Sequence, residues 1–194
     1  MFFIFGSSGI IGRELKKKLV KKFGNNKVKY IGKKFKNKKI DLSNYKIFKK
    51  FPEHPYKNVY ILAAKSNLIF NNLKKEQSQI NINISIVNNV IKFCKKCKVE
   101  RVFFLSSSAV YSNTNKLPFK ETQKIKPYNS LGKSKNISEK LLKKKFENYN
   151  TKVIVLRLFT VYGNKMRKNQ FLYQAIKKFK SNKKILFFWN KETI

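Results

Sequence analysis

The stretch FFIFGSSGIIG, residues 2–12, decides the fold of this chain. Residues 2–5 are a short apolar run, which is typical of a parallel strand buried on both faces. Beyond the glycines, apolar residues recur at every fourth position among lysines, at Ile11, Leu15, Leu19 and Phe23. Gly24 then supplies a helix stop. The stretch therefore predicts a strand, a glycine-rich turn and an amphipathic helix.

Three glycines, Gly6, Gly9 and Gly12, have separate roles in such a turn. The first permits a tight turn, the second lets the backbone approach a pyrophosphate, and the third lets the helix pack close to the strand. The helix N-terminus then offers unpaired N–H groups to the anion. Because a predicted strand precedes the glycines and a predicted helix follows them, we interpret them as a nicotinamide-dinucleotide site rather than a merely structural turn.

The composition indicates one domain with an extreme charge. The 194 residues suffice for a single core, and 42% of them are apolar. The net charge is +37, from 46 basic and 9 acidic residues. All but four of the basic residues are lysines, spread from Lys16 to Lys191, whereas nucleic-acid recognition favours the forked guanidinium of arginine. We attribute the charge to a genome rich in A/T codons and expect no specific nucleic-acid partner.

Targeting and metal signals are weak. No apolar run approaches the ~20 residues needed to cross a bilayer, and no basic leader precedes the first strand. We therefore expect no membrane partner and a cytoplasmic location. Cys94 and Cys97 form a single C-x-x-C pair, which predicts ordinary reduced helix residues and no metal site.

Strand and helix patterns alternate along the chain. Strands are predicted at 2–5, 28–31, 59–64, 102–105, 153–159 and 185–188, and helices at 11–23, 82–96, 130–147 and 170–180. This alternation predicts an α/β Rossmann fold, a doubly wound parallel sheet with helices on both faces.

The GxxGxxG spacing and several later motifs resemble the extended short-chain dehydrogenases/reductases, the NAD-dependent epimerase/dehydratase family. The other matching segments are Asp41-Leu42, Leu62-Ala63-Ala64-Lys65, Asn83, FLSSSAVY at 104–111, RLFTVYG at 157–163 and WNKETI at 189–194. The resemblance implies an NAD(P)-binding Rossmann domain at 1–165. It also implies that 166–194 begin a truncated substrate-binding region, the C-terminal substrate domain being largely absent.

The resemblance further implies a cofactor site, a catalytic pair and a substrate class. The cofactor-binding residues would be Gly6, Ser8, Gly9, Ile10, Ile11, Gly12, Asp41, Leu42, Ala63, Ala64, Lys65, Ser106 and Lys135. Ser107, four residues before Tyr111, occupies the position of the catalytic Ser or Thr, and Lys135 that of the catalytic Lys. The substrate would be a nucleotide-diphosphate sugar, and a homodimer is left open.

The choice between NAD and NADP stays open. An acidic residue after the second strand would select NAD, and a basic one could hold the 2′-phosphate of NADP. Lys33 and Lys34 stand there, which favours NADP only slightly in a chain this rich in lysine.

One departure concerns the family's Tyr-x-x-x-Lys pair, whose tyrosine moves a proton while hydride moves to or from carbon. Leu131 stands at the tyrosine position, and a leucine transfers no proton. Tyr128, seven residues before Lys135, would have to reach back from the preceding loop. Two hypotheses stay open: an NAD(P)-dependent epimerase, dehydratase or reductase of nucleotide sugars, and a noncatalytic dinucleotide-binding remnant or regulatory module.

Overall fold

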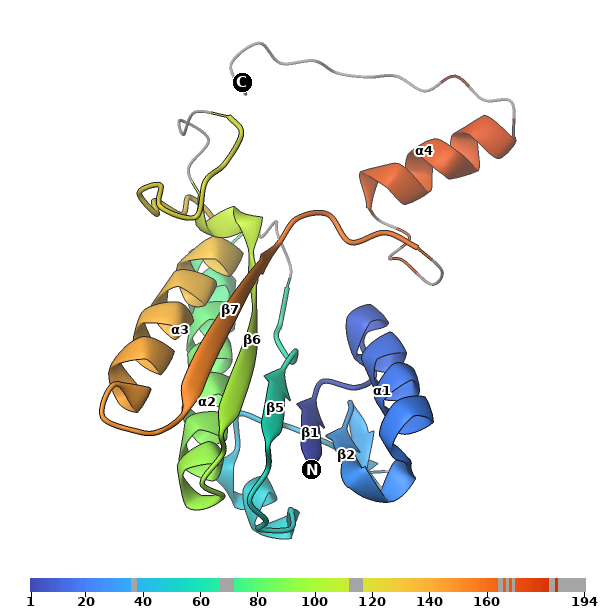
Figure 1. Ribbon diagram of the computed structural model, residues 1–194. Helices are drawn as coiled ribbons and strands as arrows, with labels where there is room; N and C mark the ends of the chain where they lie inside the picture. The colour runs from blue at the N-terminus through green and yellow to red at the C-terminus, as the bar shows by residue number, and fades with distance from the viewer. Residues whose placement is uncertain are drawn as a thin grey trace.

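A parallel five-stranded sheet forms the centre of the computed structural model (Figure 1). The structure describes residues 1–35, 38–66, 72–111, 117–163, 166, 168, 170–181 and 184. The strands of the sheet are β1 (Phe2–Phe5), β2 (Val28–Ile31), β5 (Asn58–Ile61), β6 (Arg101–Ser107) and β7 (Lys152–Leu158). Their order is β2-β1-β5-β6-β7, and every neighbouring pair is parallel.

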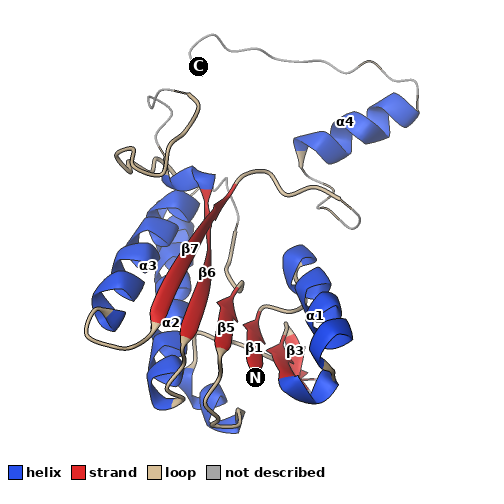
Figure 2. Cartoon of the chain, viewed as in Figure 1, coloured by secondary structure: helices blue, strands red, loops and turns tan. Residues whose placement is uncertain are grey.

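Helices lie on both faces of this sheet (Figures 1 and 2). Helix α1 (Ile10–Phe23) covers one face, and α2 (Leu73–Lys96) and α3 (Ser130–Phe146) pack side by side on the other. Helix α4 (Phe171–Lys180) lies apart from the sheet, and none of its residues is buried. This arrangement confirms the predicted doubly wound Rossmann fold.

The chain changes direction across the sheet at β1. From β1 it passes through α1 to β2 on one side, and later returns to β5 on the other side. In open α/β sheets, ligands bind in the crevice outside the carboxyl ends of the two strands that flank such a switch point. The fold therefore places the candidate crevice where Gly6 follows β1 and Leu62 follows β5.

The main core lies between the sheet and the α2/α3 layer. It holds an aromatic cluster made of Phe3, Phe5, Phe48, Phe51, Tyr56 and Phe93. The predicted apolar face of α2 is confirmed, because Ile86, Val87, Val90, Ile91 and Cys94 are all buried. Cys94 in α2 and Cys97, the residue that follows its last turn, are buried free thiols in this core.

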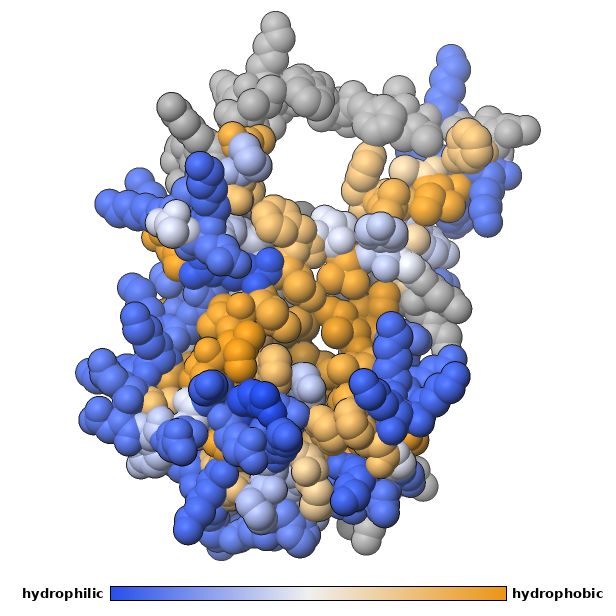
Figure 3. Space-filling model, viewed as in Figure 1, coloured by the Kyte–Doolittle hydropathy of each residue, from blue (hydrophilic) through white to orange (hydrophobic). Residues whose placement is uncertain are grey.

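The opposite face of the sheet is less covered. On β6 the side chains alternate between buried and half-buried, so the strand is not buried on both faces. Leu156 on β7 is 40% exposed. Figure 3 shows apolar side chains gathered on this face over β6 and β7, with hydrophilic side chains around them.

Several boundaries differ from the sequence prediction. The strand expected at 59–64 ends at Ile61. The helix expected at 82–96 begins at Leu73, because the side chain of Asn72 accepts a hydrogen bond from Lys74 N at 2.7 Å and caps two polar turns that precede the apolar pattern. The short antiparallel pair β3 (Lys34–Phe35) and β4 (Lys38–Lys39) was not predicted.

Short 3₁₀ helices, also not predicted, are η1 (Asn25–Lys27), η2 (Tyr45–Lys50) and η3 (Ser108–Val110). The strand predicted at 185–188 and the motif at 189–194 lie outside the described residues. Among the helices that the structure describes, none is both long and apolar enough to cross a membrane.

Candidate functional site

The glycine turn after β1 is shaped by close backbone contacts. Gly6 has φ 101°, a conformation that side-chain-bearing residues rarely adopt. A Cβ at Gly6 would lie 2.6 Å from the backbone nitrogen of Ala63, and a Cβ at Gly12 would lie 2.2 Å from the Gly6 carbonyl oxygen. The packing of α1 and of the segment after β5 against the turn therefore requires glycine at both positions.

Gly9 differs from its two neighbours. Its φ of −70° suits any residue. A Cβ at this position would meet only the Gly6 carbonyl oxygen, at 3.5 Å, which is an ordinary contact. No atom of the described protein crowds a Cβ at Gly9, which is also the N-cap of α1, so the backbone here leaves room for a ligand to approach. Helix α1 begins at the next residue without a side-chain cap, so this cradle fits a pyrophosphate.

One wall of the crevice follows β2. The backbone nitrogens of Gly6 and Ser7 both donate to the Ile31 carbonyl, at 2.8 and 2.9 Å. Ser8 Oγ accepts from Lys33 N at 3.1 Å. These bonds join the glycine turn to the residues that follow β2. In Rossmann proteins, residues at this place contact the 2′ position of the adenosine ribose and so select NAD or NADP.

The Asp41-Leu42 segment is attached to helix α2. Asn89 Nδ2 donates to the carbonyl oxygens of Leu42 at 3.1 Å and Ser43 at 2.8 Å. Asp41 Oδ1 accepts from Ser43 N at 2.9 Å and from Ser43 Oγ at 2.7 Å. Asn89 is buried, so it fixes the backbone of this segment from within the core.

The other wall follows β5 and is clamped by Asn83. Asn83 Oδ1 accepts from Lys65 N at 2.8 Å, and its Nδ2 donates to the Lys65 carbonyl at 2.9 Å and to Ser134 Oγ at 3.1 Å. Leu62 N donates to the Phe5 carbonyl at 2.9 Å. One buried amide thus holds the segment from Ala63 to Lys65 and also contacts α3.

Helix α3 is pinned to the segment that contains Ser107. A Cβ at Gly132 would lie 2.0 Å from the Ala109 carbonyl oxygen, so the helix and the η3 turn touch through backbone. Lys135 Nζ donates to the Leu105 carbonyl. Ser107 Oγ accepts from Ala109 N at 3.2 Å and caps η3. The structure therefore brings the first turns of α3 against residues on both sides of Ser107.

Lys135 is buried, with 6% of its surface exposed. Its ammonium lies 4.6 Å from the centroid of the Phe104 ring. Burial lowers the pKa of the Lys135 amine to about 8, and the Glu139 carboxylate one turn along the helix acts in the opposite direction.

Leu131, at the expected tyrosine position, is buried in the first turn of α3, and its carbonyl accepts from Ser134 Oγ at 2.8 Å. Its side chain has no group that could move a proton. Tyr128 lies in the loop before the helix with 62% of its surface exposed.

The sequence comparison decides the family. A sequence model of the NAD dependent epimerase/dehydratase family matches residues 2–193. The chain belongs to this family. The family is NAD-dependent by its own description, which agrees with the dinucleotide predicted from the glycine turn.

Two curated relatives and one solved structure illustrate the similarity of this family member. Protein CapI of Staphylococcus aureus is 27% identical over 194 aligned positions, which cover 90% of this chain and 58% of CapI. UDP-glucose 4-epimerase of Streptococcus mutans is 29% identical over 115 positions, covering 59% of this chain and 34% of that enzyme. The chain thus spans at most about three fifths of either relative.

The structure of UDP-glucuronic acid 4-epimerase from Bacillus cereus in complex with NAD superposes with a TM-score of 0.72. It is 22% identical, and the match covers 94% of this chain and 63% of that enzyme. At this identity the likeness shows the fold, and it agrees with the Rossmann topology of the described strands.

Sequence reasoning missed two polar groups in this epimerase/dehydratase family member. Gln79 Nε2 donates to Ser130 Oγ at 3.3 Å between α2 and α3. The hydroxyl of Ser106, predicted as a cofactor residue, donates instead to the buried Glu139 carboxylate. The sequence could have indicated Glu139, because it is one of only 9 acidic residues and stands one helical turn after Lys135.

Proposed function

We propose that this chain is built as an NAD(P)-dependent epimerase, dehydratase or reductase of a nucleotide-diphosphate sugar, and that its turnover is limited because Leu131 stands at the position of the catalytic tyrosine. The observation that carries the proposal is the open cradle at Gly9, where a Cβ would meet nothing closer than 3.5 Å although glycine stands there. The named UDP-sugar epimerases among the relatives support the substrate class.

Different residues of the candidate crevice would contact different parts of the cofactor. The N–H groups of Ile10 and Ile11 at the start of α1 would hold the pyrophosphate. Asp41 and Leu42 would contact the adenine half, while Ala63, Ala64 and Lys65 would form the opposite wall. The ammonium of Lys135 would hold the ribose of the nicotinamide half, and Ser106 stays a predicted cofactor contact.

The nicotinamide ring, when bound, accepts hydride from a sugar carbon and can return it. Ser107 would donate a hydrogen bond to the sugar oxygen on that carbon and orient it. The oxygen must also lose or gain a proton, and Leu131 offers no group for this. We therefore expect firm cofactor binding with slow or no turnover.

The test combines a binding titration with turnover of UDP-glucose and UDP-glucuronic acid. Quenching of protein fluorescence by NADH and by NADPH should show saturable binding, and the tighter of the two identifies the cofactor. Leu131→Tyr should raise turnover by about 10²–10⁴-fold, the usual contribution of a positioned proton-transfer group. Leu131→Phe, which has the ring without the hydroxyl, is the matched control and should not.

The results separate the two hypotheses left by the sequence. Binding of NAD(H) with turnover only in Leu131→Tyr would mark the chain as a family member that lost its proton-transfer group. Binding without turnover in any variant would favour a noncatalytic dinucleotide-binding module. Absence of saturable binding to either dinucleotide would contradict the proposal.

A further inference from the structure

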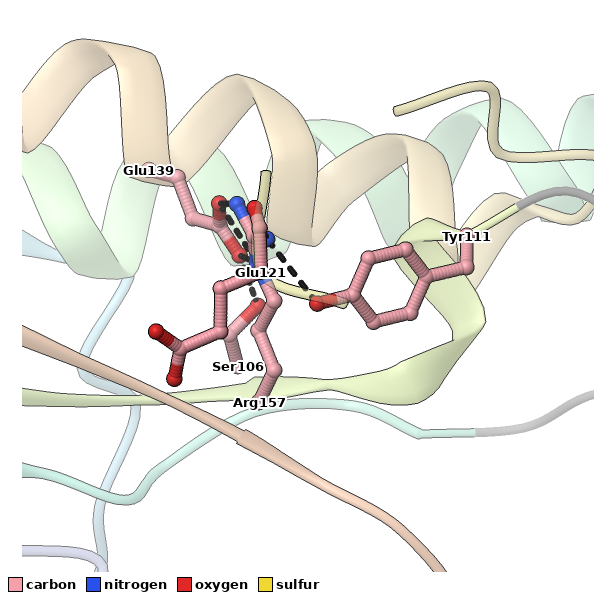
Figure 4. Close-up of polar contacts among 5 residues, drawn as sticks. All are labelled: Ser106, Tyr111, Glu121, Glu139 and Arg157. Atoms are coloured by element: carbon pink, nitrogen blue, oxygen red, sulfur yellow. Dashed lines mark hydrogen bonds and ion pairs between the residues drawn. The ribbon is translucent and has the colours of Figure 1, made fainter. Parts of the chain in front are cut away.

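A partly buried guanidinium beneath α3 joins four parts of the chain (Figure 4). Arg157 Nη2 donates to Glu139 Oε2 at 2.8 Å, and its Nε lies 3.2 and 3.3 Å from the two carboxylate oxygens. Ser106 Oγ donates to Glu139 Oε1. Because Ser106 and Arg157 are register partners on β6 and β7, one carboxylate from α3 ties both strands to the helix.

The other edge of the guanidinium contacts the loop that follows β6. Arg157 Nη1 donates to the Tyr111 hydroxyl at 3.1 Å and to the Glu121 carbonyl at 3.2 Å. The Tyr111 ring stacks on Phe119, with centroids 5.0 Å apart, and Tyr111 pairs with Ile125 through an isolated β-bridge. Arg157 thus holds the residues on the far side of Ser107 as well as those before it.

Burial distinguishes this ion pair from the other close pair in the described chain. The side chains of Arg157 and Glu139 are 19% and 9% exposed, whereas those of Lys96 and Glu53 are 60% and 49% exposed. A partly buried pair also gains little net stability, since the loss of hydration offsets much of the attraction. The fork of an arginine does fix a geometry, because its donors lie in one rigid plane.

We propose that Arg157 is a positioning residue of the cofactor site, which acts through Glu139 and Tyr111 to set the end of β6 against the first turns of α3. The groups positioned are Ser107, which follows Ser106, and Lys135, one turn before Glu139 on the same helix. The inference rests on the proposed function, because Lys135 and Ser107 matter only if a dinucleotide and its substrate bind there.

The experiment compares two ligands in the full chain by calorimetric titration. NADH contains both halves of the dinucleotide, whereas ADP contains only the adenine and pyrophosphate half, which would contact the glycine turn and the Asp41-Leu42 segment. Arg157→Lys keeps the positive charge but replaces the planar guanidinium, with its several donors, by a single ammonium. It should weaken NADH binding about tenfold, the effect of losing one hydrogen bond to a charged group, and leave ADP binding within about twofold.

Two further variants keep the test decisive. Tyr111→Phe removes one hydrogen bond to Arg157 but keeps the stacked ring, so it should fold and weaken NADH binding about threefold with ADP binding unchanged. Glu53→Gln removes the exposed pair with Lys96 and should change neither affinity.

Each outcome bears on one proposal or the other. A selective loss of NADH affinity in Arg157→Lys, or in Tyr111→Phe if the first variant does not fold, supports positioning. Equal losses for NADH and ADP indicate a merely structural ion pair and overturn the inference, as does unchanged NADH affinity. If the unsubstituted chain binds neither ligand, the proposed function fails first and the inference fails with it.

Discussion

At the scale of single residues, the three glycines of the turn have separable roles. Gly6 and Gly12 are required by the protein itself, because a Cβ would lie 2.6 and 2.2 Å from backbone atoms. At Gly9 the protein leaves room for a Cβ, since its nearest contact would be 3.5 Å away, and we propose that an approaching ligand favours the glycine there. Substitutions at Gly6 or Gly12 therefore test the stability of the fold, whereas a substitution at Gly9 tests ligand binding.

Gly9→Ala should therefore impair binding with only a small loss of stability. We expect the free energy of unfolding, measured with urea, to fall by no more than about 1 kcal/mol, because Gly9 is the N-cap of α1 and alanine is a poorer N-cap than glycine. The NADH affinity should fall roughly tenfold, because the added methyl group displaces the phosphates from the N–H groups at the start of α1. Gly12→Ala is the matched control, and overpacking there should cost about 1–3 kcal/mol of stability. Unchanged NADH affinity in Gly9→Ala would argue against pyrophosphate binding at Gly9 and the start of α1.

Lys135 should make stability depend on alkaline pH. Its pKa is lowered by burial from 10.5 to about 8 in the folded chain, so between these values the unfolded state holds more protons than the folded state. The free energy of unfolding should then rise with pH through that window. Below it, both states are protonated and the full cost of the buried charge remains.

Lys135→Met isolates this contribution. The difference in unfolding free energy between the variant and the unsubstituted chain should favour the variant at pH 7 and narrow steadily by pH 10. Lys133→Met removes an exposed charge from the same helix and controls for the change in net charge. A difference that is the same at both pH values would contradict the burial of a charged amine.

At the scale of elements, Asn83 connects the end of β5 to both long helices. Its buried amide makes three hydrogen bonds, two to the Lys65 backbone and one to Ser134. Asn83→Ala removes all three hydrogen bonds and should lower the free energy of unfolding by about 1–3 kcal/mol in urea denaturation. Asn81→Ala, on the exposed side of the same helix, should stay within about 0.5 kcal/mol. If both variants lower the free energy of unfolding equally, the hydrogen bonds of Asn83 do not hold the end of β5 in place.

The elements nearest the glycine turn are those that sequence patterns predict best. The strands at 2–5 and 28–31 have the predicted bounds, because short apolar runs there are flanked by glycine, lysine and asparagine. The start of α2 was missed by nine residues, since its first turns are polar and depend on one cap at Asn72. The Arg157–Glu139 pair escaped prediction because it joins a helix to the following strand across 18 positions, with no local periodicity to indicate it.

At the scale of the whole molecule, the net charge of +37 produces repulsion among all the elements of the fold. Like charges spread over a compact surface repel one another, which destabilises the folded state relative to the expanded chain. Salt screens this repulsion, and the Debye length falls from about 30 Å at 0.01 M to about 8 Å at 0.15 M. The partly buried Arg157–Glu139 pair is screened less than the exposed lysines.

We therefore expect added NaCl to stabilise this protein. Thermal unfolding followed by circular dichroism should show Tm rising between 20 and 500 mM NaCl, by about 2–4 °C for each kcal/mol of repulsion that is screened. The double variant Lys17→Glu and Lys18→Glu, at exposed positions of α1, should be more stable in low salt and gain less from added salt. If Tm is flat or falls with salt in the unsubstituted chain, self-repulsion is not a significant term. A salt gain that is equally large in the double variant would instead point to specific binding of the anion.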